Sequence, residues 1–441
     1  RSPDEKLEAF NVLLKYFCSK TITVYLAGNL LVSLVYADNC NFSGATLVSG
    51  EDTDFILCGD QLPVNISINF RDPDMMDVVY LQSLQRCAVD DKRNGFHVVL
   101  NARHVGETAL EVVDSMTSQK ICSSNVQILP PQNQEVPAWH NSMPLEDARY
   151  LDVNGIRTRY FDRGKGPVLI LVHGGQAGGA NNSAQKWEQN FTELSRNFRV
   201  IALDRLAQAG TANLPAAEDY AEYFARDAQH LEDFVIALGL RNVALVGHSQ
   251  GGWPVTRLAL QRPDLVSCLV NVDTVMVPDN MELMREALAF ILYTARFTDP
   301  PTGPTIHSAR RAMALRYPSG NNITTAKAQR VANQYQSPKT AVARKHMAAL
   351  RMNPLHPSFK ALKQQAYADF NSGKLQVRSL VIWGEQDPQV PLGLGQEFNA
   401  QLAAANVATK LVVIKGAGHA PFVEFPHAFN KQIIRYCNDV R

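Results

Sequence analysis

The chain has 441 residues, 46% of them hydrophobic and 19% charged, and its formal net charge is +1. These values are typical of a globular protein that is long enough for two or three domains. A net charge near zero argues against general binding to nucleic acid. The sequence contains no run of 18 apolar residues, so we expect no membrane span.

Charge is nevertheless distributed unevenly along the chain. Residues 1–140 contain 10 Lys or Arg and 17 Asp or Glu, whereas residues 275–378 contain 15 Lys or Arg and 5 Asp or Glu. The second segment therefore leaves open a local site for an anionic ligand. The first residue is Arg1 rather than Met, which indicates that an N-terminal leader has been removed or is not included. The compartment stays open.

The cysteines give no sign of a metal site. Seven are present, and their spacing does not match that of metal ligands, so the sequence implies neither a metal nor an organic cofactor. Cys268 and Cys437 are predicted to be small buried hydrophobic residues.

The first 130 residues have the pattern of an all-β domain. After a helical pattern over 4–19, short β-branched or aromatic runs between 21 and 129 alternate with Gly, Asn and Asp clusters, which predicts a β-sandwich. Residues 95–129 loosely resemble the last strands of an immunoglobulin-like module. We expect this domain, 1–130, to mediate protein interaction or oligomerisation. A proline-rich linker is predicted over 131–144.

Residues 145–441 have the pattern of an α/β domain. Two runs joined by Asn154-Gly155 predict a hairpin with a type I′ turn. Buried-strand patterns then alternate with helical patterns, which predicts a doubly wound, mostly parallel sheet with helices on both faces. The predicted strands are Val168–Val172, Val200–Leu203, Val243–Val246, Leu269–Val272, Leu380–Trp383 and Leu411–Ile414.

One long interval interrupts this alternation. Residues 275–378 contain no strand pattern and read as four or five helices. An insertion at this point lies over the carboxyl ends of the strands, where open α/β sheets bind ligands. The segment is therefore predicted to be a lid.

The residues 247–251 have the form Gly-x-Ser-x-Gly, between an apolar strand pattern and a helical one. This arrangement is typical of a nucleophile elbow, in which the central serine, Ser249, lies on a sharp turn. The helix that follows directs its positive end at the serine and favours an oxyanion there.

Two later residues can complete a catalytic triad with Ser249. Asp387 and His419 each follow a predicted strand, in the chain order of an α/β-hydrolase triad. A serine hydroxyl needs an imidazole to take its proton, and the imidazole needs a carboxylate to hold its tautomer. Asp273, which follows the preceding strand, is the competing candidate for the carboxylate. The backbone N–H groups of Gln250 and Gly175 are the expected oxyanion donors.

From about residue 145 to its end, the chain resembles the α/β-hydrolase superfamily. The resemblance rests on His173-Gly174-Gly175, residues 247–252, Trp383-Gly384 with Asp387, and Gly418-His419, which occur together in the family's order. Residues 173–181 and 418–424 are similar to those of meta-cleavage-product hydrolases, which split carbon–carbon bonds in vinylogous diketo acids.

Two positions differ from that narrower group, and one loop differs from the superfamily. His248 stands where such enzymes usually have Asn, and Ala420 stands where Trp is common. In residues 204–209, alanines occupy positions where the superfamily commonly has glycines. These differences leave the substrate class open.

The sequence thus predicts a serine hydrolase that uses water to cleave a small, largely apolar ester, which can carry a carboxylate. Gly174, His248, Arg285 and Arg296 are candidate substrate-binding residues, the two arginines for a carboxylate. One alternative is a carbon–carbon bond hydrolase acting on a vinylogous diketo acid. The other is a non-catalytic binding protein on a hydrolase scaffold.

Overall fold

A computed structural model describes the strands between Ile22 and Leu129, the turn at 115–118, and residues 142–438 apart from 299–303, 354 and 406. Contacts divide the chain into two units, Arg1–Glu135 and Val136–Arg441. Within the described residues, no helix is both long and apolar enough to cross a membrane.

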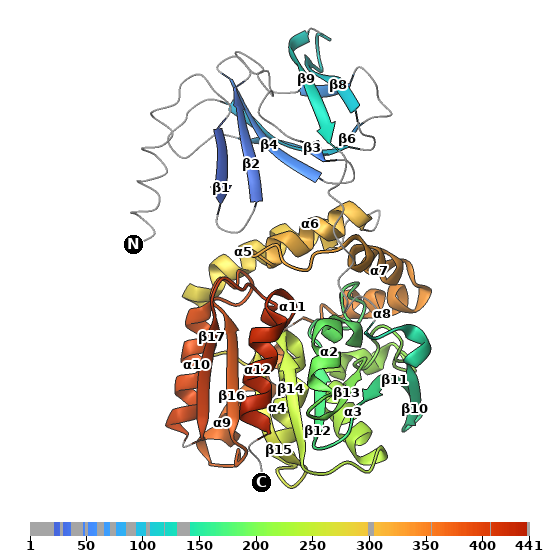
Figure 1. Cartoon of the computed structure of the whole chain (residues 1–441), viewed down its shortest axis with the longest axis vertical. Helices are drawn as coiled ribbons and strands as arrows, with labels where there is room; N and C mark the ends of the chain where they lie inside the picture. Colours follow the sequence, from blue (N-terminus) through green and yellow to red (C-terminus); the bar gives the residue numbers. More distant parts are fainter. Residues whose placement is uncertain are drawn as a thin grey trace. The chain divides into compact units, whose positions relative to one another are not determined.

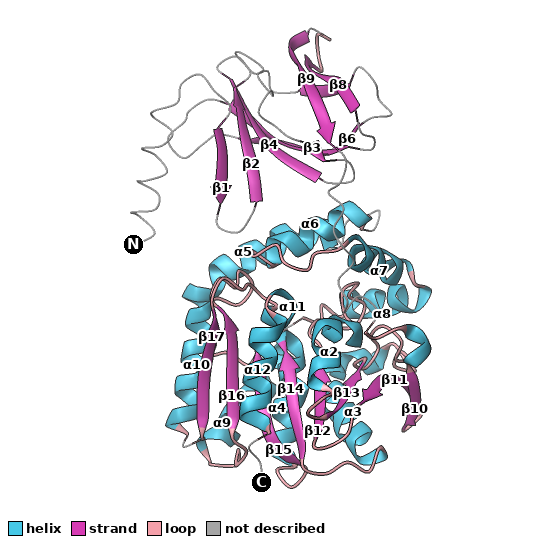
Figure 2. Ribbon diagram, viewed as in Figure 1, coloured by secondary structure: helices cyan, strands magenta, loops and turns pink. Residues whose placement is uncertain are grey.

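The described residues of the first unit are strands and one turn (Figure 2). They form a five-stranded sheet in the order β1-β2-β4-β7-β6 and a four-stranded sheet in the order β3-β9-β8-β5. The β-sandwich with an immunoglobulin-like module stays a prediction, and the predicted helix over 4–19 lies outside the described residues. The strands are β1 Ile22–Leu26, β2 Leu30–Tyr36, β3 Leu47–Val48, β4 Asp52–Gly59, β5 Ile66–Phe70, β6 Met76–Leu84, β7 Asn94–Ala102, β8 Gly106–Asp114 and β9 Lys120–Leu129.

The second unit is built on one eight-stranded sheet with the order β10-β11-β13-β12-β14-β15-β16-β17. The hairpin β10–β11 turns at Asn154 and Gly155, which both have positive φ, as the type I′ prediction requires. In the part of the sheet with the order β13-β12-β14-β15-β16-β17, all neighbouring strands are parallel. The prediction of a mostly parallel sheet is therefore confirmed. The strands are β10 Arg149–Val153, β11 Ile156–Arg163, β12 Val168–Val172, β13 Arg199–Leu203, β14 Val243–His248, β15 Val266–Val272, β16 Ser379–Gly384 and β17 Thr409–Ile414.

Helices connect these strands and cover both faces of the sheet (Figure 1). The α-helices are α2 Glu188–Leu194, α3 Tyr223–Ala237, α4 Gly252–Gln261, α5 Met281–Thr298, α6 Ile306–Arg316, α7 Thr325–Gln336, α8 Pro338–Ala349, α9 Pro357–Asn371, α10 Leu392–Ala404, α11 Pro421–Glu424 and α12 Pro426–Cys437. Short 3₁₀ helices are η1 Leu145–Asp147, η2 Ala184–Trp187, η3 Glu218–Glu222 and η4 Ser249–Gly251.

Alternate residues of the central strands fill two cores, one on each face. In β12, Ile170 packs with residues of α3, α4, α9 and α10, whereas its neighbours Leu169 and Leu171 pack with α2 and α12. This alternation follows from the two-residue period of a strand and explains why the buried strands read as continuous apolar runs.

The described residues of the 275–378 segment form helices, as predicted, whereas the role of this segment as a lid stays a prediction. The helices α5 to α8 run along the carboxyl-end side of the parallel strands (Figure 1). The last helix of the 275–378 segment, α9, instead packs on a face of the sheet, where the Phe359 ring contacts the rings of Phe224 and Trp253. We therefore use "lid" for α5–α8 only.

The prediction for Cys268 and Cys437 is incomplete. Both residues are buried, as expected, but they form a disulfide that ties β15 to the end of α12. They are 169 residues apart in the chain, so no local pattern links them.

Candidate active site

The residues 247–251 form the sharp turn that their pattern predicts. Strand β14 ends at His248, and Ser249 begins a helical turn that continues into α4. Ser249 has φ of 51°, a left-handed conformation that a non-glycine residue adopts only under strain. A Cβ atom on Gly251 would lie 2.5 Å from the carbonyl oxygen of His173, so the turn needs glycine there.

Three side chains converge at the carboxyl ends of three strands. The Nε2 atom of His419 lies 3.1 Å from Oγ of Ser249, and its Nδ1 atom lies 2.7 Å from Oδ2 of Asp387. The backbone N–H groups of Gln389 and Val390 donate to Oδ1 of Asp387, at 2.7 and 3.0 Å. The structure thus brings together a hydroxyl, an imidazole and a buried carboxylate in a hydrogen-bonded row.

The competing carboxyl, Asp273, is also close to this row. It follows β15 directly, is fully buried and accepts a hydrogen bond of 2.9 Å from the backbone N–H of Gly384. The imidazole nevertheless bonds to Asp387 and not to Asp273. The geometry therefore favours Asp387 as the partner of His419.

The two expected oxyanion donors lie beside Ser249. Gly175 and Gln250 both line the cavity that contains the serine. Gln250 is in the first turn after the elbow, where backbone N–H groups have no helical acceptor. Gly174 packs against the serine itself, because a Cβ atom there would lie 2.7 Å from Cβ of Ser249. Gly174 is not one of the described residues that line the cavity.

A buried arginine holds the loop of Gly175, which sequence reasoning did not identify. Arg205 is 2% exposed, and its Nη1 atom donates to the carbonyl oxygens of Gly175 and His173. Its Nη2 atom forms an ion pair with Asp227 of α3. The only sequence signal is the loop 204–209, in which alanines stand where the superfamily commonly has glycines. Ala207 and Ala209 in that loop both adopt positive φ.

His248 is a structural neighbour of the row and also lines the cavity. Its Nε2 atom donates to the carbonyl oxygen of His419, at 2.7 Å. Burial, with Lys186 and His419 nearby, lowers the pKa of His248 well below its usual value, so its ring is neutral. The Nδ1 atom is then an acceptor, and within the described part of the chain it has no partner.

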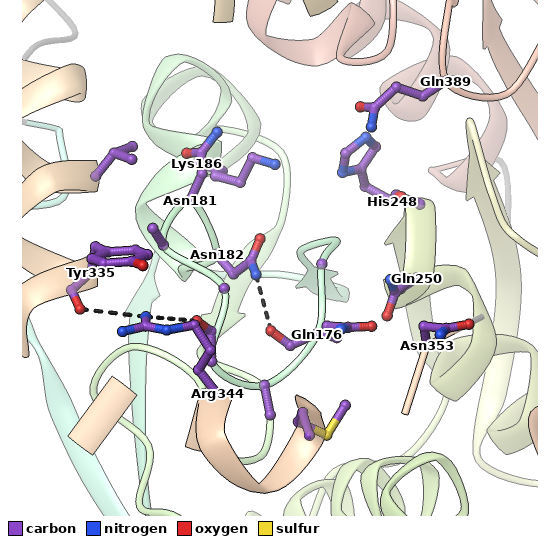
Figure 3. A pocket seen from close by; sticks show the side chains of 18 of the residues that line it. Gln176, Asn181, Asn182, Lys186, His248, Gln250, Tyr335, Arg344, Asn353 and Gln389 are labelled. Atoms are coloured by element: carbon purple, nitrogen blue, oxygen red, sulfur yellow. Dashed lines mark hydrogen bonds between the residues drawn. The ribbon is translucent and has the colours of Figure 1, made fainter. Parts of the chain in front are cut away.

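Ser249 lines a cavity of about 490 Å³, and Figure 3 shows other residues of its wall, among them His248, Lys186 and Arg344. The loop 175–182 and the lid helices α7 and α8 supply most of its wall. Its described lining includes no Asp or Glu but four cationic side chains: Lys186, Arg316, Arg344 and Arg351. The site is therefore electropositive, which suits an anionic ligand.

Two of these cations have no carboxylate partner among the described residues. Burial is the main cause that lowers the pKa of Lys186 to about 7, and Arg316 and Lys327 add to it. Burial also lowers the pKa of Arg316. Arg344 differs, because its guanidinium stacks on the Tyr335 ring at 3.7 Å.

Of the two predicted arginines, the structure describes the side chain of Arg285 only, and it does not bring that residue to the cavity. Arg285 is exposed on α5 and does not contribute to the described lining. Arg296 belongs to the same helix, but its side chain lies outside the described residues. No group of three or more metal-ligating side chains is found within the described residues either.

Residues 167–426 match the model of the alpha/beta hydrolase fold family. The 2-hydroxy-6-oxo-6-(2'-aminophenyl)hexa-2,4-dienoic acid hydrolase of Metapseudomonas resinovorans is 37% identical over 123 residues, which are 28% of this chain and 40% of that protein. Bifunctional epoxide hydrolase 2 of Rattus norvegicus is 28% identical over 152 residues, 33% of this chain and 26% of that protein. A solved meta-cleavage product hydrolase from Pseudomonas fluorescens shares the fold, with a TM-score of 0.53, 20% identity, and coverage of 67% of this chain and 100% of that one.

Proposed function

Because the chain belongs to the alpha/beta hydrolase fold family and its relatives are hydrolases, we propose that it is a serine hydrolase with Ser249, His419 and Asp387 as its catalytic triad. The observation that carries this proposal is the hydrogen-bonded row from Ser249 through His419 to Asp387. A turn that holds a serine at positive φ at the floor of a cavity supports the same role.

Each triad residue has one task in the proposed reaction. His419 takes the proton of Ser249 through Nε2 while the oxygen attacks a substrate carbonyl, and it returns the proton to the leaving group. Asp387 fixes the proton on Nδ1 and stabilises the imidazolium. The N–H groups of Gly175 and Gln250 receive the oxyanion. Water then releases the acyl group by the same route.

The cavity lining supports a substrate that carries a carboxylate. Lys186 and Arg316 both line the cavity, one from the 3₁₀ helix η2 and one from the end of α6, and the charge of Arg316 is close enough to lower the pKa of Lys186. Neither has a carboxylate partner among the described residues, so an acidic substrate can supply one. These two residues, in place of Arg285 and Arg296, are the proposed carboxylate ligands. The bond cleaved is an ester in this proposal.

A second candidate is hydrolysis of a carbon–carbon bond in an acidic diketone. It is favoured by the 37% identical relative, whose name gives a dienoic acid as its substrate. The same row of side chains and the same cationic lining serve this reaction, because it also needs an oxygen nucleophile at a carbonyl carbon.

Labelling of the full chain with a fluorophosphonate probe tests the nucleophile. We expect the wild type to react and Ser249→Ala not to react. An unlabelled wild type would favour a binding protein on a hydrolase scaffold. Turnover of a p-nitrophenyl ester and of a dienol acid then separates the two bond types.

A matched pair of arginine variants tests the carboxylate site. Arg316→Met should raise KM for an acidic ester more than for its neutral analogue, by about tenfold or more for a lost charge-assisted hydrogen bond. Arg285→Met, on the exposed part of α5, should leave both KM values unchanged. An equal effect of Arg316→Met on both esters would contradict the proposal.

A further inference from the structure

A second buried carboxyl group, that of Asp273, lies beside the proposed triad, and the proposed reaction does not use it. Asp273 follows β15, and its backbone N–H donates to the carbonyl oxygen of Ile382 in β16, at 3.1 Å. Its Oδ1 atom accepts from the N–H of Gly384, at 2.9 Å. These two bonds direct its side chain toward the segment after β16, which carries Asp387.

Asp273 and Asp387 both bond to the backbone of Gly384: its N–H donates to Oδ1 of Asp273, and its carbonyl oxygen accepts from the N–H of Asp387, at 3.3 Å. The carboxyl of Asp387 is close enough to raise the pKa of Asp273. Asp273 is 0% exposed, and no donor among the described residues reaches its Oδ2 atom. The oxygens of Asp387 already accept from two backbone N–H groups and from the imidazole of His419. An ionised carboxyl group can only accept hydrogen bonds, so two neighbouring carboxyls can bond to each other only if one of them carries a proton.

We propose that Asp273 is a neutral carboxylic acid that donates its O–H to Asp387 and so acts as a positioning residue for the triad. The proposal rests on the role of Asp387 in the proposed function. The proton belongs on Asp273 rather than on Asp387, because Asp387 has three donors around it and Asp273 has one.

The surroundings of Asp273 favour the neutral form. The ionisable groups that face it are Asp387, Glu424 and, across Asp387, His419. Burial, together with the charge of Asp387, raises the pKa of Asp273 well above its usual range. A shared proton between two touching carboxyls is the general solution to like-charge repulsion in a buried site.

The O–H donor has a specific structural effect on Asp387. Backbone N–H groups hold one of its oxygens, and the imidazole bonds to the other. A fourth donor, from the end of β15, restricts rotation of the carboxylate about its last bond. Because this donor is neutral, it orients the carboxylate without adding a second negative charge beside His419.

The pH profile of Asp273→Asn tests the charge. Asparagine keeps the acceptor for Gly384 and supplies an N–H donor for Asp387, but it cannot ionise. The acid limb of kcat/KM reports protonation of the catalytic imidazole. We expect its midpoint to be the same in the wild type and in Asp273→Asn. If Asp273 were charged, its removal would lower that midpoint by roughly one pH unit, as expected for a neighbouring charge, and this result would overturn the proposal.

A comparison with Asp273→Ala tests the donor. Alanine removes the O–H and leaves Asp387 free to rotate, so kcat should fall roughly tenfold below that of Asp273→Asn, with a similar KM. Equal kcat values for the two variants would show that the donor does not position Asp387.

Infrared difference spectroscopy gives a readout that does not need catalysis. In the full chain labelled with carboxyl-¹³C aspartate, the wild type should show a protonated carboxyl band at neutral pH that Asp273→Asn removes. Asp264→Asn is the matched control, since hydrogen bonds from Arg262 hold the pKa of Asp264 below its usual value and its loss should remove no such band. Absence of the wild-type band would overturn the proposal even if the enzyme is active, and a band in an inactive protein would retain it.

Discussion

Glu424 connects the lid to the loop of His419, and its burial predicts a pH-dependent stability. Its Oε1 atom accepts from the N–H of Gly418, at 2.8 Å, and its Oε2 atom accepts from the hydroxyl of Ser319, at 2.8 Å. Burial is the main cause that raises the pKa of Glu424 from 4.5 to about 7. The folded state therefore holds a proton that the unfolded chain has lost between pH 4.5 and about 7.

The direction and size of the effect follow from this difference. Stability from Glu424 is fully present below pH 4.5 and is lost as pH rises through about 7. At 1.36 kcal/mol per unit of pKa difference, the loss is about 3 kcal/mol in total. Glu424→Gln cannot ionise, so its stability should lack this component at every pH.

Urea unfolding of the wild type and of Glu424→Gln, at pH values from 5 to 8, measures the effect. Tryptophan fluorescence can follow the second unit, since Trp187, Trp253 and Trp383 are buried there. The free energy of unfolding of the wild type, relative to the variant, should decrease by about 2.5 kcal/mol across this range, since part of the loss occurs below pH 5. Titration of other groups cancels in the comparison. A difference that stays constant with pH would refute the reasoning.

Two further predictions concern the frame of the site. Arg205→Lys removes the two-pronged contact with Gly175 and Asp227, so we expect kcat on a neutral ester to fall by about tenfold or more while KM changes little. A change in KM alone would contradict this role. Reduction of the disulfide between Cys268 and Cys437 should lower the free energy of unfolding by up to about 5 kcal/mol, because it closes a 169-residue loop. Alkylation of both thiols in the unreduced native chain would contradict the pairing.

Much of the fold could be predicted because its signals are local. The strand runs of the second unit are apolar on both sides, which is a strong pattern, and all six predicted runs lie within β12 to β17. The turn at Asn154-Gly155 and the elbow around Ser249 depend on backbone conformations that few residues adopt, and both have the expected positive φ. The sequence could not separate α9 from the lid helices, because α9 has an amphipathic pattern like that of its neighbours.

The features that could not be predicted arise from contacts between distant parts of the chain. Lys186 and Arg316 are 130 positions apart, and only the packing of α6 over the body places both in one cavity. Arg285 has the same charge and lies in the same predicted lid, so the sequence could not separate it from Arg316. The pairing of Cys268 with Cys437 has the same cause.

The lid contacts both loops that carry the proposed catalytic groups. On one side, a Cβ atom on Gly178 would lie 2.4 Å from the backbone of Arg344, so α8 packs directly on the loop 175–182, which carries the proposed oxyanion donor Gly175. On the other side, the N–H of His419 donates to the carbonyl oxygen of Arg316, the last residue of α6. An acidic substrate bound to the Arg316 side chain would therefore contact the same residue whose carbonyl oxygen holds the histidine loop. The side chain and the backbone of Arg316 thus have separate tasks in the proposed function, so truncating the side chain should affect KM for acids while the backbone contact maintains kcat.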